Sequence, residues 1–501
     1  MKRIILLLLC SALLPVLIAQ PDAPTIELSL QQVIKLATDS SLSAFIAENT
    51  YYAGYYSYMN YSAQKKPFLS LSTTPLNFNR SVSQQYNFQD SSYYYVEQQT
   101  LSSSGNLSLN QNLMKTGGSI YLDSDLGFLK NLNKDIPGQY SSTPLRIGFS
   151  QQLFGFNQYK WLNRIEPLKF EKAKKQLIES MEEISIKAIG YFFDMARARI
   201  NLEIASTNLA NADTLYSIGL KRSEIAAITR EDLYTLRLAL INSENAYENA
   251  RTDLKKARMR LYSLLRLDNA LNIELVLPEK LPGVVLEPEN CLLQARENNP
   301  DVLGFIQQRL EAQREVERAK RSSQFNARLN ASFGLNQQGS RLADAYRDPL
   351  DQEIVRVSLN IPLVDWGLAK GQYRLAQKNQ QVVEASLEQA EIDFNQAVLL
   401  TVDEFNLQEK LVRGAAQADT VAGWAYEITK RRFMTGNADI IRLKSAQSES
   451  IAAQRAYINA LENYWAYYYM IRRMTLYDFE NARSLTDEFD RIIGITEYEI
   501  D

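Results

Sequence analysis

The chain carries the same plan twice, and this duplication limits the folds that are open to it. In the second copy, two runs alternate between apolar and polar residues, at Ala327–Leu335 and at Val355–Val364. Alternation with a period of two indicates strands with one apolar and one polar face. Runs of this size cross a bilayer at a tilt, which takes about 9 to 11 residues. We therefore predict membrane-crossing strands, although an ordinary antiparallel sheet beside a helical domain would fit either half alone.

Long helical stretches follow the strands in both copies. After Pro362 the chain contains no further proline, and Leu368–Arg432 reads as one helix. At 1.5 Å per residue such a helix spans about 100 Å. In the first copy no proline lies between Pro167 and Pro278, and a break is expected around Ser217–Thr229.

The returning limb of each helical stretch carries apolar and small residues that step by three and four. In the first copy they are Leu233, Leu236, Leu240, Ser243, Tyr247, Ala250, Leu254, Ala257, Leu261 and Leu264, and in the second Leu443, Ala446, Ser450, Ala453, Tyr457, Ala460, Tyr464 and Tyr467. This period predicts supercoiled partner helices. A second stripe from Ile441 through Arg455 and Glu462 to Trp465 predicts another neighbour, as in a cylinder of helices with water inside. A plain antiparallel coiled-coil rod with one solvated face would also explain the period.

The first copy contains more strand candidates than the second. They are Leu69–Phe78, Gly105–Leu113, Ser119–Phe128 and Leu145–Phe154. The stretch Ser81–Ser104 is rich in Ser, Gln, Tyr and Asn and is predicted to be a long surface loop. Rising helices are expected before the strands, near Ser29–Asn60 and Glu289–Arg321. Six tyrosines between Tyr51 and Tyr61 fit either an aromatic belt at a membrane interface or packing between helices.

The composition argues against a catalytic function. The chain contains no histidine, and it has no GxGxxG, P-loop, GxSxG or CxxC motif. We therefore expect no enzyme activity, no catalytic residue, no cofactor and no metal site. The 55 Lys and Arg residues nearly balance the 58 Asp and Glu residues, so nothing favours nucleic acid as a partner.

The N-terminus is predicted to be an export signal over residues 1–19. Lys2 and Arg3 precede an apolar run that ends at Ala19, and no later segment is apolar enough for a transmembrane helix. Any membrane insertion would therefore use strands. Cys10 lies inside the signal, so the mature chain keeps only Cys291, which is expected to be buried on a short helix and to form no internal disulfide.

Specific passages resemble the TolC-like outer-membrane efflux proteins. LNIPLVDWGLAKGQYRLA at Leu359–Ala376 is similar to the family's passage from strand to tunnel helix, and FSQQLFGFNQYKWLNRIEPL at Phe149–Leu168 is its counterpart in the first copy. RRFMTGNADIIRL at Arg431–Leu443 and KRSEIAAITREDLYTL at Lys221–Leu236 resemble the family's periplasmic tips. The resemblance covers nearly all of the mature chain.

The resemblance implies an α+β membrane protein with an internal duplication. Long coiled-coil helices would form a periplasmic α-barrel continuous with a transmembrane antiparallel β-barrel, both shared by a homotrimer. Each protomer would give four strands to a shared twelve-stranded barrel, since four strands cannot close a barrel alone. The strands in the membrane would be Leu69–Phe78 and Leu145–Phe154 in the first copy, with the extra hairpin Gly105–Phe128 extending outside.

Along the chain this predicts nine segments. They are the signal peptide 1–19, an N-terminal segment and rising helix 20–66, outer-membrane strands with extracellular loops and the extra hairpin 67–155, a periplasmic helical hairpin 156–268, a linker 269–288, a second rising helix 289–323, second strands 324–365, a second helical hairpin 366–479 and a C-terminal tail 480–501.

The function implied by the resemblance is that of an exit duct in a tripartite efflux or type I secretion system. The duct would lie in the outer membrane of a Gram-negative bacterium, in contact with outer-membrane lipid, and would extend far into the periplasm. Its partners would be a periplasmic adaptor, or membrane fusion protein, and a proton-driven or ATP-driven inner-membrane transporter. The alternative is a non-conducting periplasmic coiled-coil scaffold or structural protein.

Candidate site residues lie at the two helix turns. Asp232 and Asp439 are predicted gate residues, because carboxylates repeated around a narrow end favour cations, or alternatively they cap the returning helices. Residues expected to contact the adaptor are Arg222, Ala226, Ala227, Arg432, Gly436 and Asn437. Ala226 replaces the glycine of the family's tip. The interval Gly436–Asp439 is three residues shorter than Ala226–Asp232, which predicts a tighter second turn.

Overall fold

A computed structural model of the chain describes residues 25–133, 137–225, 228–268, 271–278, 281–435, 437–438 and 440–487. These residues form two compact units. The helical unit takes the described parts of Met1–Phe45, Met181–Val285 and Glu404–Met470. The sheet unit takes those of Ile46–Ser180, Leu286–Asp403 and Ile471–Asp501. Several long helices run from one unit into the other.

The duplication is visible in the lengths of the helices. Helix α3 (Gln158–Glu224) and helix α7 (Leu368–Met434) each contain 67 residues, and α4 (Arg230–Leu265) and α8 (Ile440–Thr475) each contain 36. The prediction of one uninterrupted helix from Leu368 is confirmed. The two turns are equally long, since five residues separate α3 from α4 and five separate α7 from α8. The prediction of a tighter second turn is therefore wrong.

Each predicted rising helix is two helices. In the first copy α1 (Leu30–Ser40) and α2 (Leu42–Ala63) are separated by Ser41, and in the second α5 (Pro288–Asn298) and α6 (Pro300–Ser322) by Asn299. Ser41 and Asn299 both have extended backbone angles. Pro300 favours an extended conformation at the residue before it, which ends α5. The prediction that Cys291 is buried on a short helix is confirmed, because it lies fully buried on α5.

In the helical unit, α8 has a neighbour on each side. The Phe405 ring of α7 packs 5.2 Å from the Tyr464 ring, and from the other side Arg455 donates to Asn201 of α3 at 2.9 Å. The second stripe of α8 therefore contacts a second helix, as predicted, and the structure identifies this helix as α3. Beyond α3 lies α4, whose Arg260 is 3.9 Å from Asp194. The four helices form a row in the order α4, α3, α8, α7.

The burial of α4 follows its predicted seam, whereas the buried residues Ile458, Leu461 and Trp465 of α8 lie off the predicted seam of that helix. Ala257, Leu261 and Leu264 of α4 are buried, and so is Tyr464 of α8. Toward the turns the seam residues remain less exposed than the residues beside them. The stepped pattern of apolar and small residues thus identifies the packed face of α4, and only part of that of α8.

Two short strands accompany the helical unit. Strand β1 (Thr25–Ser29) pairs in parallel with β6 (Asn272–Val276), which lies in the stretch predicted to be a linker. Ser29 also caps α1 through a capping box with Gln32. In the sheet unit β9 (Tyr477–Asp478) pairs with β10 (Arg483–Ser484).

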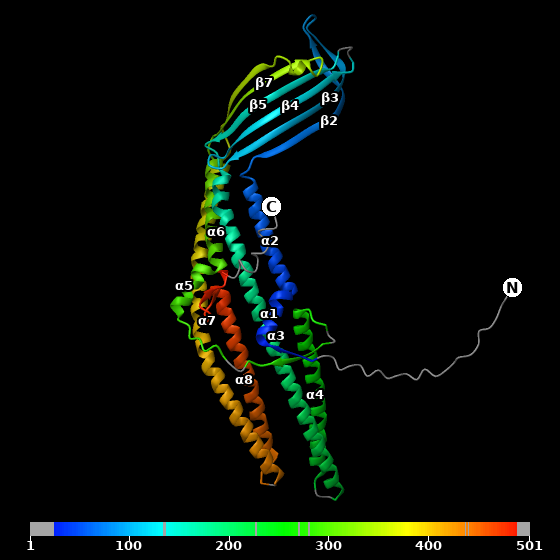
Figure 1. The fold of residues 1–501 in the computed structure, drawn as a ribbon, viewed down its shortest axis with the longest axis vertical. Coiled ribbons are helices and arrows are strands. Elements are labelled where there is room, and N and C mark those ends of the chain that lie inside the picture. Colours follow the sequence, from blue (N-terminus) through cyan, green and yellow to red (C-terminus); the bar gives the residue numbers. More distant parts are fainter. Residues whose placement is uncertain are drawn as a thin grey trace, which may run out of the picture. The chain divides into compact units, whose positions relative to one another are not determined.

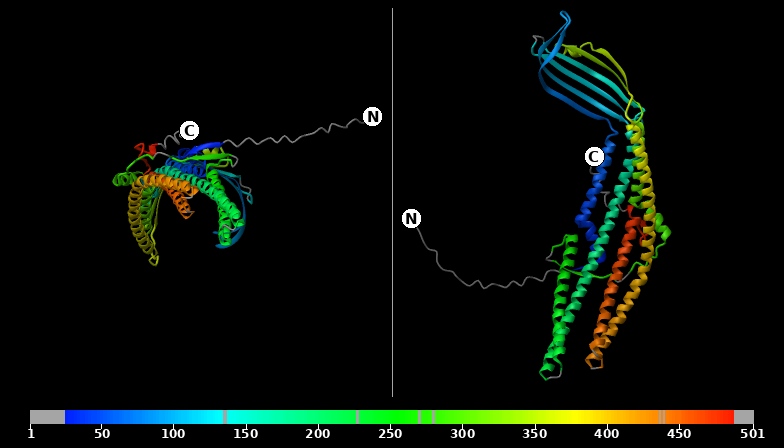
Figure 2. Two further views of the ribbon diagram at one scale, coloured as in Figure 1. Left: turned by 90° about the horizontal axis from the view of Figure 1, so that it is seen from below. Right: turned by 180° about the vertical axis from the view of Figure 1, so that it is seen from behind.

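The sheet unit is built around one antiparallel sheet of six strands. The strands are β2 (Phe68–Asn87), β3 (Ser92–Leu113), β4 (Gly118–Asn131), β5 (Gln139–Leu153), β7 (Asn326–Gly339) and β8 (Leu350–Asn360), in that spatial order. A short 3₁₀ helix, η1 (Asp344–Tyr346), lies between β7 and β8. Figures 1 and 2 show a single curved layer, over which no long helix of the described chain lies, and η1 packs against β5 and β7.

One prediction about the first copy is wrong. The stretch Ser81–Ser104 is not a loop, because it forms the paired ends of β2 and β3 and the turn between them. The hairpin Gly105–Phe128, predicted to extend outside the membrane, forms parts of β3 and β4, which lie between β2 and β5 in the sheet. The sheet of this one chain therefore has six strands, two more than the resemblance implied.

The tyrosines of α2 pack against α3. The Tyr58 ring stacks on Phe170 at 4.7 Å, and Tyr51 and Tyr61 are buried. Packing between helices is thus observed for these residues, while Tyr56 remains half exposed.

Candidate functional site

The six-stranded sheet has one apolar and one polar face, and it is the strongest candidate site. Strand pairing places Leu69, Leu109, Leu122, Ile147 and Phe333 side by side across five neighbouring strands, and all five side chains are exposed. On β8 Glu353 pairs with Phe333 and ends this row with a charge, and the same face then carries Val355, Val357 and Leu359, with Val355 75% exposed. An exposed apolar face of this extent marks contact with a partner or a membrane.

Polar and charged groups lie on the opposite face. Arg146 of β5 forms a bidentate pair with Asp123 of β4, at 2.9 Å and 2.6 Å, and its Nη2 also reaches Asp125 at 2.8 Å. Asn106 of β3 donates to the other oxygen of Asp125 at 2.5 Å. Asp123 and Asp125 are thus held by a cation from the same sheet. This arrangement suits a surface that faces water.

Both long edges of the sheet lack a strand partner among the described residues. Strand β2 pairs only with β3, and β8 pairs only with β7. An open edge presents backbone N–H and C=O groups to any strand that approaches. In hydrocarbon such groups cost several kcal/mol each when they are unpaired. The sheet is therefore incomplete as a membrane structure until something pairs with its edges.

The helical row also has two open flanks. The outer flank of α7 exposes Leu407, Leu411, Val421, Trp424 and Ile428, and α4 exposes Tyr234, Leu238 and Ile241. These residues occur on the two helices at the ends of the row. Apolar side chains spread along a long solvent-facing helix indicate a further helical partner.

The predicted gate residue Asp232 takes part in the N-terminal cap of α4, next to the turn between α3 and α4. Thr229 is the N-cap of α4, and its hydroxyl accepts from the Asp232 backbone N–H at 3.1 Å. The Asp232 carboxylate accepts from the Thr229 hydroxyl at 2.7 Å and from its backbone N–H at 3.2 Å. These hydrogen bonds lower the pKa of Asp232. Asp232 is exposed and has a capping function, which was the alternative for this residue.

The other tip residues are only partly described. Arg222 and Arg432 are exposed at the ends of α3 and α7, and Asn437 donates from its backbone to the Arg432 carbonyl at 2.8 Å. Ala226, Ala227, Gly436 and Asp439 lie outside the described residues. The matched turn lengths show that Asp439, directly before α8, corresponds in sequence to Thr229 and not to Asp232.

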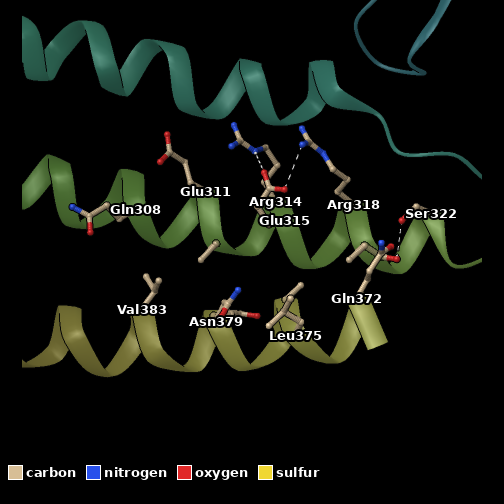
Figure 3. A pocket seen from close by; sticks show the side chains of 14 residues that line it. Gln308, Glu311, Arg314, Glu315, Arg318, Ser322, Gln372, Leu375, Asn379 and Val383 are labelled. Carbon is tan, nitrogen blue, oxygen red and sulfur yellow. Dashed lines mark hydrogen bonds and ion pairs between the residues drawn. The ribbon is translucent and has the colours of Figure 1, made fainter. Parts of the chain in front are cut away.

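A groove between α6 and α7 in the sheet unit is a seam between helices. Figure 3 shows Leu375, Asn379 and Val383 of α7 pointing toward α6. On α6, Glu315 pairs with Arg314 at 3.0 Å and with Arg318 at 3.4 Å, so its charge is satisfied within the helix. The residues lining this groove do not converge on a common point as those of a ligand site do. None of the helices in the described part of the chain contains an apolar stretch of membrane-spanning length.

Comparison with known proteins identifies the architecture. Residues 292–472 match the model of the outer membrane efflux protein family. The solved structure of the Campylobacter jejuni CmeC outer membrane channel is similar with a TM-score of 0.64 at 13% identity, covering 94% of this chain and 90% of that one. The predicted resemblance to TolC-like outer-membrane efflux proteins is confirmed.

Two further solved structures share the fold. The outer membrane protein VceC of Vibrio cholerae has a TM-score of 0.59 at 15% identity, with 89% of this chain and 95% of that chain covered. The open state of the Neisseria gonorrhoeae MtrE outer membrane channel has a TM-score of 0.55 at 16% identity, with 89% and 88% covered. No curated protein sequence matches the chain. The match to the family model covers only residues of the second copy, and in the first copy the similarity is one of fold.

Proposed function

We propose that the protein is a trimeric outer-membrane channel that acts as the exit duct of a tripartite efflux or type I secretion system. Its sheet would cross the outer membrane, and its helices would extend into the periplasm of a Gram-negative cell. It would receive substrate from a proton-driven or ATP-driven inner-membrane transporter through a periplasmic adaptor. The duct itself would carry out no chemistry.

The observation that carries this proposal is the two-faced sheet with open edges. The apolar face suits hydrocarbon, and the polar face with Arg146, Asp123 and Asp125 suits a water-filled lumen. Because a membrane strand must have its backbone groups paired, the edges β2 and β8 require strands from further copies of the chain. Assembly is then obligatory for insertion.

The helical row supports the same assembly from the other unit. Its open flanks on α4 and α7 expose apolar side chains, as expected where one copy packs against the next. A helix of 67 residues spans about 100 Å, which suits a conduit that reaches deep into the periplasm. A row of four helices repeated by symmetry encloses a bore.

We place the gate and the adaptor contacts at the turns of the helical hairpins. Asp232 and Asp439 would attract cations at the inner end, with Asp232 keeping its capping role. Arg222, Ala226, Ala227, Arg432, Gly436 and Asn437 would meet the adaptor. Arg222 and Arg432 are exposed at the ends of their helices, as this contact requires.

Reconstitution into planar bilayers tests the function. The detergent-purified mature protein should run as a trimer and produce discrete conductance steps. A folded monomer that leaves the bilayer silent would contradict the proposal and favour the non-conducting scaffold. The matched control is protein heated until the trimer dissociates, which should neither insert nor conduct, because its strand edges are unpaired.

A further inference from the structure

The hairpin β3–β4 distinguishes this sheet from the four-strand arrangement that the resemblance implied. Strand β3 pairs with β2 from Phe68 to Asn87, and β4 pairs with β5 from Ser119 to Leu129. No pairing joins β2 to β5 within the described sheet. The hairpin is therefore a continuous part of the sheet, since β2 reaches β5 only through it.

The two-faced pattern continues through the hairpin without a change of side. Leu109 of β3 lies between Leu69 and Leu122, and Leu122 of β4 lies between Leu109 and Ile147. One residue before Leu109 on β3, Ser108 lies between Ser70 and Asp123 on the opposite face. A hairpin that stood in water on both sides would have no reason to keep this alternation in register with its neighbours.

Polar and charged contacts link the β3–β4 hairpin to β5 on the polar face of the sheet. Arg146 of β5 binds two carboxylates of β4, and Asn106 of β3 binds one of them, so three strands are linked across the hairpin. Asp123 is buried, whereas Arg146 and Asp125 remain partly open to solvent. The charges of this hairpin region thus lie on the face opposite to Leu109 and Leu122, as expected of a lumen.

We propose that β3 and β4 are part of the lipid-facing wall, so that three copies of six strands close an eighteen-stranded barrel. Six is an even number, so β8 of one copy lies antiparallel to β2 of the next, as a closed antiparallel ring requires. The occupant of each open edge is thus a second copy of this chain. This inference rests on the proposed function and specifies the wall of that channel.

The consequence is a wide outer opening. Barrel diameter grows roughly in proportion to strand number, so eighteen strands give about 1.5 times the diameter of a twelve-stranded ring and about twice its area. Barrels of 16 to 18 strands leave an aqueous channel. The outer end would therefore admit hydrated solutes that are too bulky for a twelve-stranded ring, and size selection would fall to the inner end or to the pump.

Spin labels at single cysteines test whether the hairpin touches lipid. Labels at Leu107 of β3 and Leu122 of β4 are compared with a label at Leu71 of β2, which pairs with Leu107. The matched control is Ser108, the neighbour of Leu107 on the opposite face. In reconstituted trimers, collisions with oxygen report hydrocarbon and collisions with a water-soluble nickel chelate report water.

The proposal predicts that the labels at positions 107 and 122 show the same high ratio of oxygen to nickel accessibility as the label at position 71. The label at position 108 should show the inverse ratio. If 107 and 122 are accessible to nickel while 71 contacts lipid, the hairpin lies outside, the ring has twelve strands, and the proposed channel survives. If 71 is also in water, the membrane wall itself is wrong, and both proposals fail.

Discussion

Arg197 of α3 forms an ion pair with Glu462 of α8, and its removal gives the sharpest stability prediction. Its guanidinium binds Glu462 and Asn459 of α8 and Asp194 of its own helix. The Glu462 side chain is 21% exposed and that of Arg197 is 28% exposed. Burial raises the pKa of Glu462, and the neighbouring Arg197 opposes this effect. Arg197→Met keeps most of the aliphatic stem and removes the charge.

The magnitude lies between two limits. Removing one partner of a fully buried ion pair costs about 3–5 kcal/mol, whereas an exposed pair contributes about 0.2–1 kcal/mol. For a pair that is about a quarter exposed we expect about 2 kcal/mol. Amides of α8 around Glu462 should then exchange hydrogen roughly 30-fold faster in the variant, because 1.4 kcal/mol is tenfold.

Glu462→Gln in the Arg197→Met background removes the isolated carboxylate and should restore most of the protection. Arg455→Met is the matched control on the same stripe, since Arg455 contacts only the neutral Asn201 in its described hydrogen bonding, and it should change the free energy of opening by less than about 0.5 kcal/mol. Unchanged exchange in Arg197→Met, or a double variant no better protected than the single one, would refute the reasoning.

Four further predictions concern the turns, one buried acid and the cysteine. Thr229→Ala should cost about 1 kcal/mol at the start of α4, seen as faster amide exchange there, whereas Thr235→Ala, whose hydroxyl bonds only within the helix, should not produce this loss. Because the pKa of Asp232 is lowered in the folded protein, its stabilisation is present above 3.8 and is lost as pH falls through the lowered pKa; Asp232→Asn should remove this acid dependence of exchange in α4. The pKa of Glu462 is raised, so its protonated form favours the folded state, and Arg197→Met should become less stable as pH rises from acid to neutral; a flat profile would contradict this. Burial raises the pKa of Cys291 to about 12, so a thiol reagent at pH 8 should react only after unfolding, and rapid labelling of the folded protein would show that α5 opens.

The gate hypothesis has its own electrical test. Reversing the charge of Asp232 and Asp439 together should shift the channel from cation preference toward anion preference in planar bilayers. Asp232→Asn with Asp439→Asn should give an intermediate selectivity. Unchanged ion selectivity in the charge-reversed channel would remove both residues from the gate.

The repeated features of the chain could be predicted from the sequence because they depend on periodicity. The seam of α4, from Leu233 to Leu264, follows the buried face of the helix, and the second stripe of α8 contacts a second helix, as predicted. Alternation in Ala327–Leu335 and Val355–Val364 also predicted two different faces for β7 and β8. These patterns reflect which side chains are buried, and the tendency to be buried is a property of each residue type that can be seen in the sequence.

The errors arose where burial gives no signal. The outer parts of β2 and β3, within Ser81–Ser104, pair with each other but are exposed on both faces. Their sequence is therefore poor in apolar residues, which favours the prediction of a loop. Tyr93, Tyr94, Tyr95 and Val96 have the high strand propensity that identifies it, and the Asp90 side chain accepts from Ser92 N–H at the turn. The partner of each strand depends on contacts between residues distant in sequence. The position of the β3–β4 hairpin between β2 and β5 could therefore not be predicted from the local sequence. Asn299-Pro300 did mark the end of α5, and this signal was missed.

Cross-linking between the two edge strands tests the central claim most directly. A cysteine at Ser70 of β2 is combined in turn with one at Arg356, Ser358 or Asn360 of β8, all on the polar face of the sheet. Oxidation of the reconstituted channel should join chains into a closed covalent trimer for at least one pairing, with conductance retained. If no position on β8 bonds to Ser70→Cys, or if open ladders longer than three chains form, the sheet does not close by pairing β2 with β8, and the shared membrane wall is contradicted.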